Sequence, residues 1–219
     1  RQMCIRDSTK TMVASARVAY LARRGADYGV RTGPISTDLR KVRQRKRDIV
    51  ESFRSGSQRG LEETPGLDLL MGAATFTGPK ALAVRLNAGG DPLALTADLI
   101  VINTGERPGM PPVPGLDRVP TLNSTTIMEL DAVPEHLLVL GGSYVALEFG
   151  QMFARFGSRV TIVQRSGRLL SREDADVADA VAAILREDGL EVLLDAMTQG
   201  AALAGEGSIT LSVTTPEGA

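Results

Sequence analysis

The spacing of hydrophobic residues changes its period most clearly between residues 137 and 163. Leu137–Leu140 is an apolar run that is too short for a helix and is typical of a buried strand. After a glycine pair, apolar residues recur at helical spacing up to Gly157, and a second apolar run covers Val160–Val163. This order of strand, turn, helix and strand predicts a βαβ unit, the mononucleotide-binding half of a doubly wound fold.

The same reasoning predicts the other elements of an α/β protein. They are helices over 9–24, 35–53 and 174–186, a short helical piece over 125–130, short strands over 67–76, 81–86, 93–95 and 190–194, and a buried strand over 97–105. Residues 108–120 are rich in proline, which is typical of a crossing between domains or layers. The last apolar stretch, 208–213, is expected to be one arm of a hairpin that has lost its partner, which suggests a truncated chain.

The turn after the first strand of the βαβ unit has the pattern Gly141-x-Ser143-x-x-Ala146. Gly141 permits a tight turn, position 143 lets the backbone approach a pyrophosphate, and position 146 lets the helix pack on the strand. Alone, this loose pattern fits an ordinary turn equally well; its place between two strands favours a nucleotide site. The candidate NAD(P)-binding residues are Gly141, Gly142, Ser143, Tyr144, Val145, Ala146, Arg165 and Arg168.

The loop after the second strand bears on the choice of nicotinamide cofactor. Sites specific for NAD place Asp or Glu there to bind the ribose 2′-hydroxyl, whereas this chain has the neutral Gln164. Arg165 and Arg168 follow, and arginine binds phosphate through charge-assisted hydrogen bonds. We therefore expect NADP, with NAD possible; the alternative is that both arginines are solvated loop residues.

Composition and charge exclude several classes of function. The 219 residues carry a net charge of −1, with 4% aromatic residues and one cysteine, so nothing favours a polyanionic partner, a base-stacking surface or an internal disulfide framework. No apolar run is long enough to span a membrane and no secretory signal is visible, so we expect a cytoplasmic protein. The basic run 40–47 could bind nucleic acid, but a solvated helix face is the better interpretation.

Four motifs, in this order, carry a resemblance to a known family: Thr9–Met12, Gly72–Phe76, Ile102–Pro108 with Pro114–Leu116, and Gly141–Gly150. The chain resembles the flavin-dependent pyridine nucleotide-disulfide oxidoreductases, most closely their mercuric-reductase-like members, together with dihydrolipoamide dehydrogenase and glutathione reductase. The resemblance implies a Rossmann-like NAD(P)-binding domain over 126–219, truncated at its C-terminus, and a partial FAD-binding domain over 9–125. Residues 1–8 look foreign to the family.

The resemblance also implies an activity. The whole protein would be a homodimer that passes electrons from NAD(P)H through FAD to a small-molecule, disulfide or metal-ion acceptor, without nucleic-acid or membrane partners. The sequence does not determine which electron acceptor the protein reduces. The chain alone is expected to bind FAD weakly and to show no turnover. The alternative function is an NAD(P)-binding module without its own catalysis.

Individual roles follow from the family motifs. Lys10 matches a lysine beside the flavin ring, where a cation stabilises negative charge on reduced flavin. Ala73 and Ala74 match the stretch that meets the adenine of FAD, and Thr104 and Gly105 match a turn that passes near FAD.

Two further matches lie on the helix of the βαβ unit. Tyr144 matches an aromatic residue that covers the flavin until nicotinamide displaces it, and Glu148 matches the acid that pairs with the lysine. The resemblance therefore predicts a Lys10–Glu148 charge pair in a dry site beside the flavin. The alternatives are a surface tyrosine and a solvated glutamate.

The family's redox Cys-x4-Cys pair finds no match. The second cysteine lies four residues before the family lysine, and Arg6 occupies that place. Cys4 is two residues out of register, so we assign it no catalytic role, and we assign none to His136, the only histidine. No catalytic residue and no metal ligand is therefore assigned with certainty; Tyr144 and Glu148 are expected to lie near the flavin.

Overall fold

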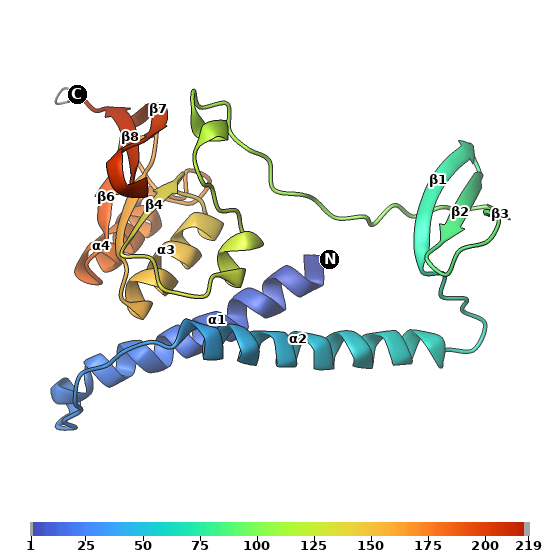
Figure 1. Ribbon diagram of the computed structural model, residues 1–219, viewed down its shortest axis with the longest axis horizontal. Helices are drawn as coiled ribbons and strands as arrows, with labels where there is room; N and C mark the ends of the chain where they lie inside the picture. Colours follow the sequence, from blue (N-terminus) through green and yellow to red (C-terminus); the bar gives the residue numbers. More distant parts are fainter. Residues whose placement is uncertain (1, 217–219) are drawn as a thin grey trace. The chain divides into compact units, whose positions relative to one another are not determined.

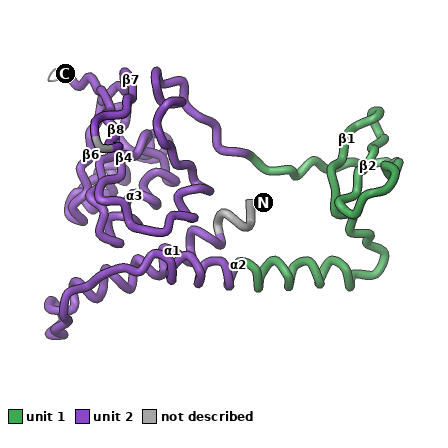
Figure 2. The backbone as a smooth tube through the Cα atoms, in the orientation of Figure 1, with its two compact units in different colours: residues 1–2, 50–106 green, residues 3–49, 107–219 purple. Residues whose placement is uncertain are grey.

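A computed structural model describes residues 2–216 of the chain. Two compact units are distinguished, unit 1 with residues 1–2 and 50–106 and unit 2 with residues 3–49 and 107–219 (Figure 2). The side chains of residues 1–6 lie outside the described residues, and with them the expectations for Cys4 and Arg6. Among the helices of residues 2–216, none combines the length and apolar character that crossing a bilayer requires.

Unit 2 contains the predicted βαβ unit (Figure 1). Strands β4 (His136–Leu140), β5 (Arg159–Val163) and β6 (Glu191–Leu193) form a parallel sheet in this order. Helix α3 (Tyr144–Phe156) connects β4 to β5 and packs on both, and α4 (Ala175–Glu187) connects β5 to β6. The expected α/β, Rossmann-like architecture is confirmed. All three strands run in one direction, so their carboxyl ends meet at one edge of the sheet, where doubly wound folds bind ligands.

The hydrophobic core of unit 2 lies where α3 faces the sheet. Phe153 and Ile162 are completely buried, and the rings of Phe153 and Phe156 meet edge to face with centroids 5.8 Å apart. The long helix α1 (Gln2–Arg23) adds Met12 and Ala16 to the same core. α1 begins at Gln2 rather than at Thr9, because an apolar stripe marks the buried face of a helix and not its start.

Helix α2 (Leu39–Glu62) begins later and ends later than predicted. The side chain of Asp38 accepts a hydrogen bond from the amide of Lys41, 3.1 Å away, which is how an N-cap residue starts a helix. Ile35 therefore lies before the helix.

The interpretation of the basic run as a solvated helix face is wrong for Lys46. Lys46 is only 4% exposed, and its ammonium donates hydrogen bonds to the carbonyl of Met128, 3.1 Å away, and to the Glu129 carboxylate. Arg47 also binds Glu129, and Arg43 pairs with Asp131 at 2.7 Å. Glu129 is the last residue of a 3-10 turn, η3 (Thr126–Glu129). A buried ammonium is tolerated because it is paired and hydrogen-bonded.

The C-terminal stretch has a partner, contrary to the expectation of an unpaired arm. Strand β8 (Ile209–Thr214) pairs in antiparallel register with β7 (Met197–Leu203), from Met197 opposite Thr214 to Leu203 opposite Ile209. The prediction failed because no strand was expected over 197–203, where small and polar residues separate Met197 from Leu203, and because strand pairing is a non-local property.

The proline-rich connector is attached to this hairpin. The amide of Ala201 on β7 donates to the carbonyl of Pro114 over 2.8 Å. Gly115 follows with φ 77°, and a Cβ placed on it would lie 2.1 Å from the carbonyl oxygen of Ala201. Leu116, which is buried, opens the 3-10 turn η2 (Leu116–Arg118). A glycine is required at 115 both by the left-handed conformation and by the close approach.

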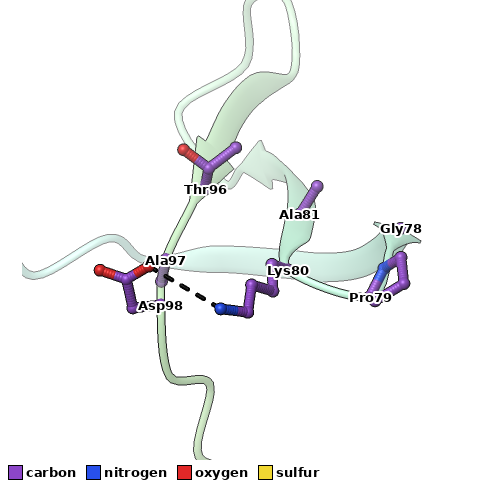
Figure 3. Close-up of a pocket in the computed structure, with 7 residues that line it drawn as sticks. All are labelled: Gly78, Pro79, Lys80, Ala81, Thr96, Ala97 and Asp98. Carbon is purple, nitrogen blue, oxygen red and sulfur yellow. Dashed lines mark ion pairs between the residues drawn. The ribbon is translucent and has the colours of Figure 1, made fainter.

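Unit 1 contains an antiparallel sheet of β1 (Gly72–Gly78), β2 (Ala81–Leu86) and β3 (Leu93–Thr96). β2 and β3 lie where strands were predicted, whereas β1 begins later than the predicted strand over 67–76. A Cβ on Gly72 would lie 2.3 Å from the Arg85 carbonyl oxygen, so β1 begins at a position that only glycine allows. A cavity of about 370 Å³ lies at the β1–β2 turn, where the Lys80 ammonium and the Asp98 carboxylate are 3.8 Å apart (Figure 3). None of the expected cofactor-binding residues lines this cavity.

The predicted buried strand over 97–105 is wrong. This segment forms no strand, and Leu99 and Val101 are 80% and 77% exposed. A buried strand needs hydrogen-bonded neighbours, and none of the sheets formed by residues 2–216 includes this segment. The run has the composition of a strand, but the described chain provides no neighbouring strand with which it pairs.

A chain of polar side chains crosses the amino ends of β4, β5 and β6. The hydroxyl of Thr161 donates to Glu191 over 2.7 Å and lies 2.9 Å from Nε2 of His136, while the Arg159 guanidinium lies 2.8 Å from Nδ1. His136 must then be neutral, with Nε2–H donating and Nδ1 accepting. Burial, followed by the positive charge of Arg159, lowers the pKa of His136, against the opposing influence of Glu191 and Glu135.

We expect the protein to lose stability as the pH falls from about 7 to about 5 because of this histidine. Its pKa is lower in the folded than in the unfolded chain, so the unfolded chain binds more protons in that range. The stabilisation is complete above the unfolded pKa, about 6.5, and disappears as the pH falls through the folded pKa. Urea unfolding of the wild type and of His136→Gln measures this. Because His136 is the only histidine, an unchanged pH dependence below pH 7 in the variant would contradict the assignment.

Candidate nucleotide-binding and flavin-facing site

The glycine turn lies at the carboxyl end of β4. Gly141 has φ 101°, and its amide donates to the carbonyl of Val163 on β5 over 2.9 Å. No atom lies within 4 Å of a Cβ placed on Gly141, so the space beside the turn is open. This combination of a left-handed glycine and open space matches a turn that a ligand approaches closely.

Helix α3 begins directly after the turn. Ser143 is its N-cap residue, is exposed, and makes no hydrogen bond from its side chain to the helix. The first amides of a helix have no partner within the helix, and its dipole favours negative charge there. The residues present therefore fit the pyrophosphate of a dinucleotide, with the backbone of 142–146 as the donor set.

The loop that carries the two arginines is packed onto this turn. The amide of Leu170 donates to the carbonyl of Gly142 over 2.9 Å. A Cβ on Gly142 would lie 2.7 Å from Cδ2 of Leu169 and 3.1 Å from Cδ of Gln164, so the loop lies directly against the second glycine. The glycine turn and the loop 164–170 thus form one structural feature, as a dinucleotide site requires.

Within this loop, Gln164 is turned inward. It is buried, and its side-chain amide donates to the hydroxyl of Ser166, 2.5 Å away, and to the backbone carbonyl of Arg168, 3.2 Å away. The side chain at the position of the NAD-type acid therefore holds the loop together. Arg165 and Arg168 are both exposed; Arg168 donates to the carbonyl of Ser171, and Arg165 has no hydrogen-bond or ion-pair partner among residues 2–216.

The predicted pair of Lys10 and Glu148 is confirmed. The ammonium on α1 lies 2.5 Å from Oε1 of the carboxylate on α3. In the described chain these two side chains are 66% and 24% exposed, and the expectation of a dry site beside bound flavin stays a prediction. Tyr144, one helical turn before Glu148, is 74% exposed. All three side chains line a groove of about 430 Å³ between α1, α3 and α4, together with Gln151, Arg155 and Ile184.

The remaining predicted flavin-contacting residues belong to unit 1. Ala73 and Ala74 lie on β1, and Thr104 and Gly105 lie in the segment without secondary structure, where Gly105 has φ 73°. All four are exposed. Their expected roles stay predictions.

Two features of the site escaped sequence reasoning. Gly150 lies in the middle of α3 on the face that packs on the sheet, since a Cβ placed there would contact Ile162 and Leu190 at 3.5 Å, an ordinary packing distance. A glycine inside a helical pattern is the signal that could have indicated this contact. Leu170 and Asp195, with φ of 45° and 49°, are the non-glycine residues of positive φ in the described chain, and nothing in the sequence marks them.

Comparisons with known proteins identify relatives of this chain. The family model of the pyridine nucleotide-disulphide oxidoreductases matches residues 7–219. A probable pyridine nucleotide-disulfide oxidoreductase of Escherichia coli, RclA, is 35% identical over 198 residues, which are 84% of this chain and 44% of the relative. The mercuric reductase of Streptomyces lividans is 36% identical over 211 residues, 96% of this chain and again 44% of the relative.

A solved structure shows the same fold. The Cu(II) complex of RclA from E. coli, described as an HOCl-induced flavoprotein disulfide reductase, superposes with a TM-score of 0.77 at 33% identity and covers 94% of this chain and 42% of its own. The chain thus spans less than half the length of the relatives it matches, and those relatives are oxidoreductases. On the match of nearly the whole chain, this protein belongs to the pyridine nucleotide-disulphide oxidoreductase family.

Proposed function

We propose that the chain forms the nicotinamide-binding part, and one contributor to the flavin environment, of an oxidoreductase that transfers electrons from NADPH through FAD to a disulfide or metal-ion acceptor. The observation that carries this proposal is the joined glycine turn and arginine loop at the carboxyl end of β4 and β5. The turn offers free helix amides to the pyrophosphate, and the loop offers two arginines and no acid at its exposed surface.

The two arginines supply the positive charge and the hydrogen-bond donors that binding a 2′-phosphate requires. The guanidinium groups of Arg165 and Arg168 reach solvent from a loop whose backbone is held by the inward Gln164. A guanidinium presents paired N–H donors to phosphate oxygens, whereas an acid at this place would repel them. This supports NADPH as the preferred reductant.

For FAD, we propose that Lys10 and Glu148 lie beside the ring. Ala73 and Ala74 would meet the adenine, and Thr104 and Gly105 would form a turn that passes near the cofactor. When bound, FAD supplies the hydride-accepting ring of the reaction. The protein's contribution at this place is orientation and charge: the ammonium of Lys10 is held by Glu148 over 2.5 Å, so its position beside the groove is set by α3. Tyr144, exposed at the first turn of α3, is free to change its rotamer when nicotinamide enters.

Replacing Glu148 with alanine should slow the reduction of flavin by NADPH in the whole protein. Loss of the carboxylate releases the ammonium of Lys10. An exposed, charged hydrogen bond contributes about 1 kcal/mol, and its loss corresponds to roughly a fivefold slower rate. Stopped-flow flavin absorbance measures the rate. Glu187→Ala, which removes an exposed acid from the last turn of α4, is the control and should reduce at the wild-type rate. Wild-type kinetics in the Glu148 variant would argue against the proposed role.

A further inference from the structure

The loop that carries the two arginines is braced by a second loop, which follows β6. The amide of Asp195 donates to the carbonyl of Ser166 over 3.2 Å, and the amide of Ala196 donates to the carbonyl of Gln164 over 3.0 Å. The two loops therefore extend from the carboxyl ends of β5 and β6 as one hydrogen-bonded pair. A side chain at position 195 is consequently part of the surface that presents Arg165 and Arg168.

The carboxylate of Asp195 lies against the middle of the arginine loop. A Cβ placed on Gly167 would be 3.1 Å from Oδ2 and 3.3 Å from Oδ1 of Asp195. Gly167 stands between the two arginines in the sequence, two residues after Arg165 and directly before Arg168. The absence of a side chain at 167 is what allows the acid to approach this closely.

The backbone of Asp195 is held in an unusual conformation. Its φ of 49° lies in the left-handed region, which costs an L-residue energy and is tolerated best by glycine, asparagine and aspartate. The residue is exposed, and among the side chains that the structure describes its carboxylate has neither an ion-pair partner nor a hydrogen-bond partner. The charge is therefore not neutralised by the protein, although arginines belong to the neighbouring loop.

We infer that Asp195 is a specificity-determining residue of the nucleotide site, whose negative charge weakens the binding of a ribose 2′-phosphate and limits the NADPH preference created by Arg165 and Arg168. The inference rests on the proposed binding of the 2′-phosphate at the arginine loop. A carboxylate packed on the middle of that loop repels a dianion bound there, while a ribose 2′-hydroxyl carries no charge to repel. Because the carboxylate is exposed, water and salt screen the repulsion, and the expected effect is moderate.

The test compares the binding of two fragments of the cofactor, adenosine 2′,5′-bisphosphate and adenosine 5′-monophosphate, by calorimetry with the 219-residue chain. Asp195→Asn removes the charge and keeps a side chain that accepts the left-handed conformation. The bisphosphate should bind about threefold more tightly to the variant at low salt, with the gain shrinking at high salt, and the monophosphate should bind unchanged. Asp179→Asn, an exposed acid on α4, is the control of equal charge and should leave both affinities as they are.

The outcomes separate this inference from the proposed function. If the Asp195 and Asp179 variants bind the bisphosphate with equal affinity, the role of Asp195 is overturned. The 2′-phosphate site itself would still stand if the wild type prefers the bisphosphate and the double variant Arg165→Ala with Arg168→Ala loses that preference. An equal gain for both fragments also overturns the role of Asp195, because a general structural effect would act on both. A wild type that binds both fragments equally, with no response to the arginine variants, instead refutes the 2′-phosphate site itself and the inference with it.

Discussion

Gly115→Ala is expected to destabilise unit 2 by at least about 2 kcal/mol, a large part of the stability of an ordinary domain. Two costs add at this position. The left-handed φ of 77° costs an alanine about 1 kcal/mol, and its Cβ would lie 2.1 Å from the carbonyl oxygen of Ala201. The connector must then move away from β7, which breaks the hydrogen bond from Ala201 to Pro114, worth about 1 kcal/mol, and loosens the buried Leu116.

The chain contains a matched control for this substitution. Gly29 has the same φ of 77° and belongs to the same unit, and a Cβ placed on it would have no atom within 4 Å. Gly29→Ala should therefore show the conformational cost alone, about 1 kcal/mol. Urea unfolding of both variants gives the two free energies. Equal losses of stability would mean that the connector is not held against β7 in the way the distances indicate.

Removing both arginines, Arg165→Ala with Arg168→Ala, is expected to abolish a preference for NADPH of at least about tenfold. Each charge-assisted hydrogen bond to a phosphate contributes about 1.5–3 kcal/mol, and a factor of ten needs about 1.4 kcal/mol. The wild type should therefore favour NADPH over NADH in kcat/KM, and the double variant should lose most of the difference. The activity with NADH should change little, since a ribose hydroxyl makes no ion pair.

Arg118→Ala is the control for the loss of positive charge. Arg118 is exposed on η2, within unit 2 but outside the two loops of the nucleotide site. Its variant should keep the wild-type ratio of kcat/KM values, measured in the whole protein with each cofactor. Equal use of NADH and NADPH by the wild type would contradict the proposed cofactor preference.

The elements that sequence reasoning placed correctly are those whose signals are local. The apolar run before Gly141 and the helical spacing up to Gly157 each lie within a few residues, and both ends of α3 are where the pattern predicts. Pairing between distant segments has no such signal. The 97–105 run looked like a strand and has no sheet to join, while 208–213 looked unpaired and lies beside 197–203.

The same distinction applies to the charged residues. The basic run of α2 suggested a solvated face, but Glu129, 83 residues from Lys46, binds it and allows its burial. The Lys10–Glu148 pair, 138 residues apart, was predicted only because a family pattern supplied the long-range information that composition and periodicity lack. Its exposure to solvent was not predicted, since a motif names residues and not their surroundings.

An NMR titration of the 219-residue chain tests most directly whether residues 141–146 and 164–168 form the proposed NADPH site. Backbone amide shifts are followed while NADPH, and separately NADH, is added. We predict saturable binding at one site, the largest shifts in the amides of the glycine turn and the arginine loop, and tighter binding of NADPH than of NADH. Saturating NADPH that leaves both segments unshifted, or that shifts other residues instead, would contradict this prediction.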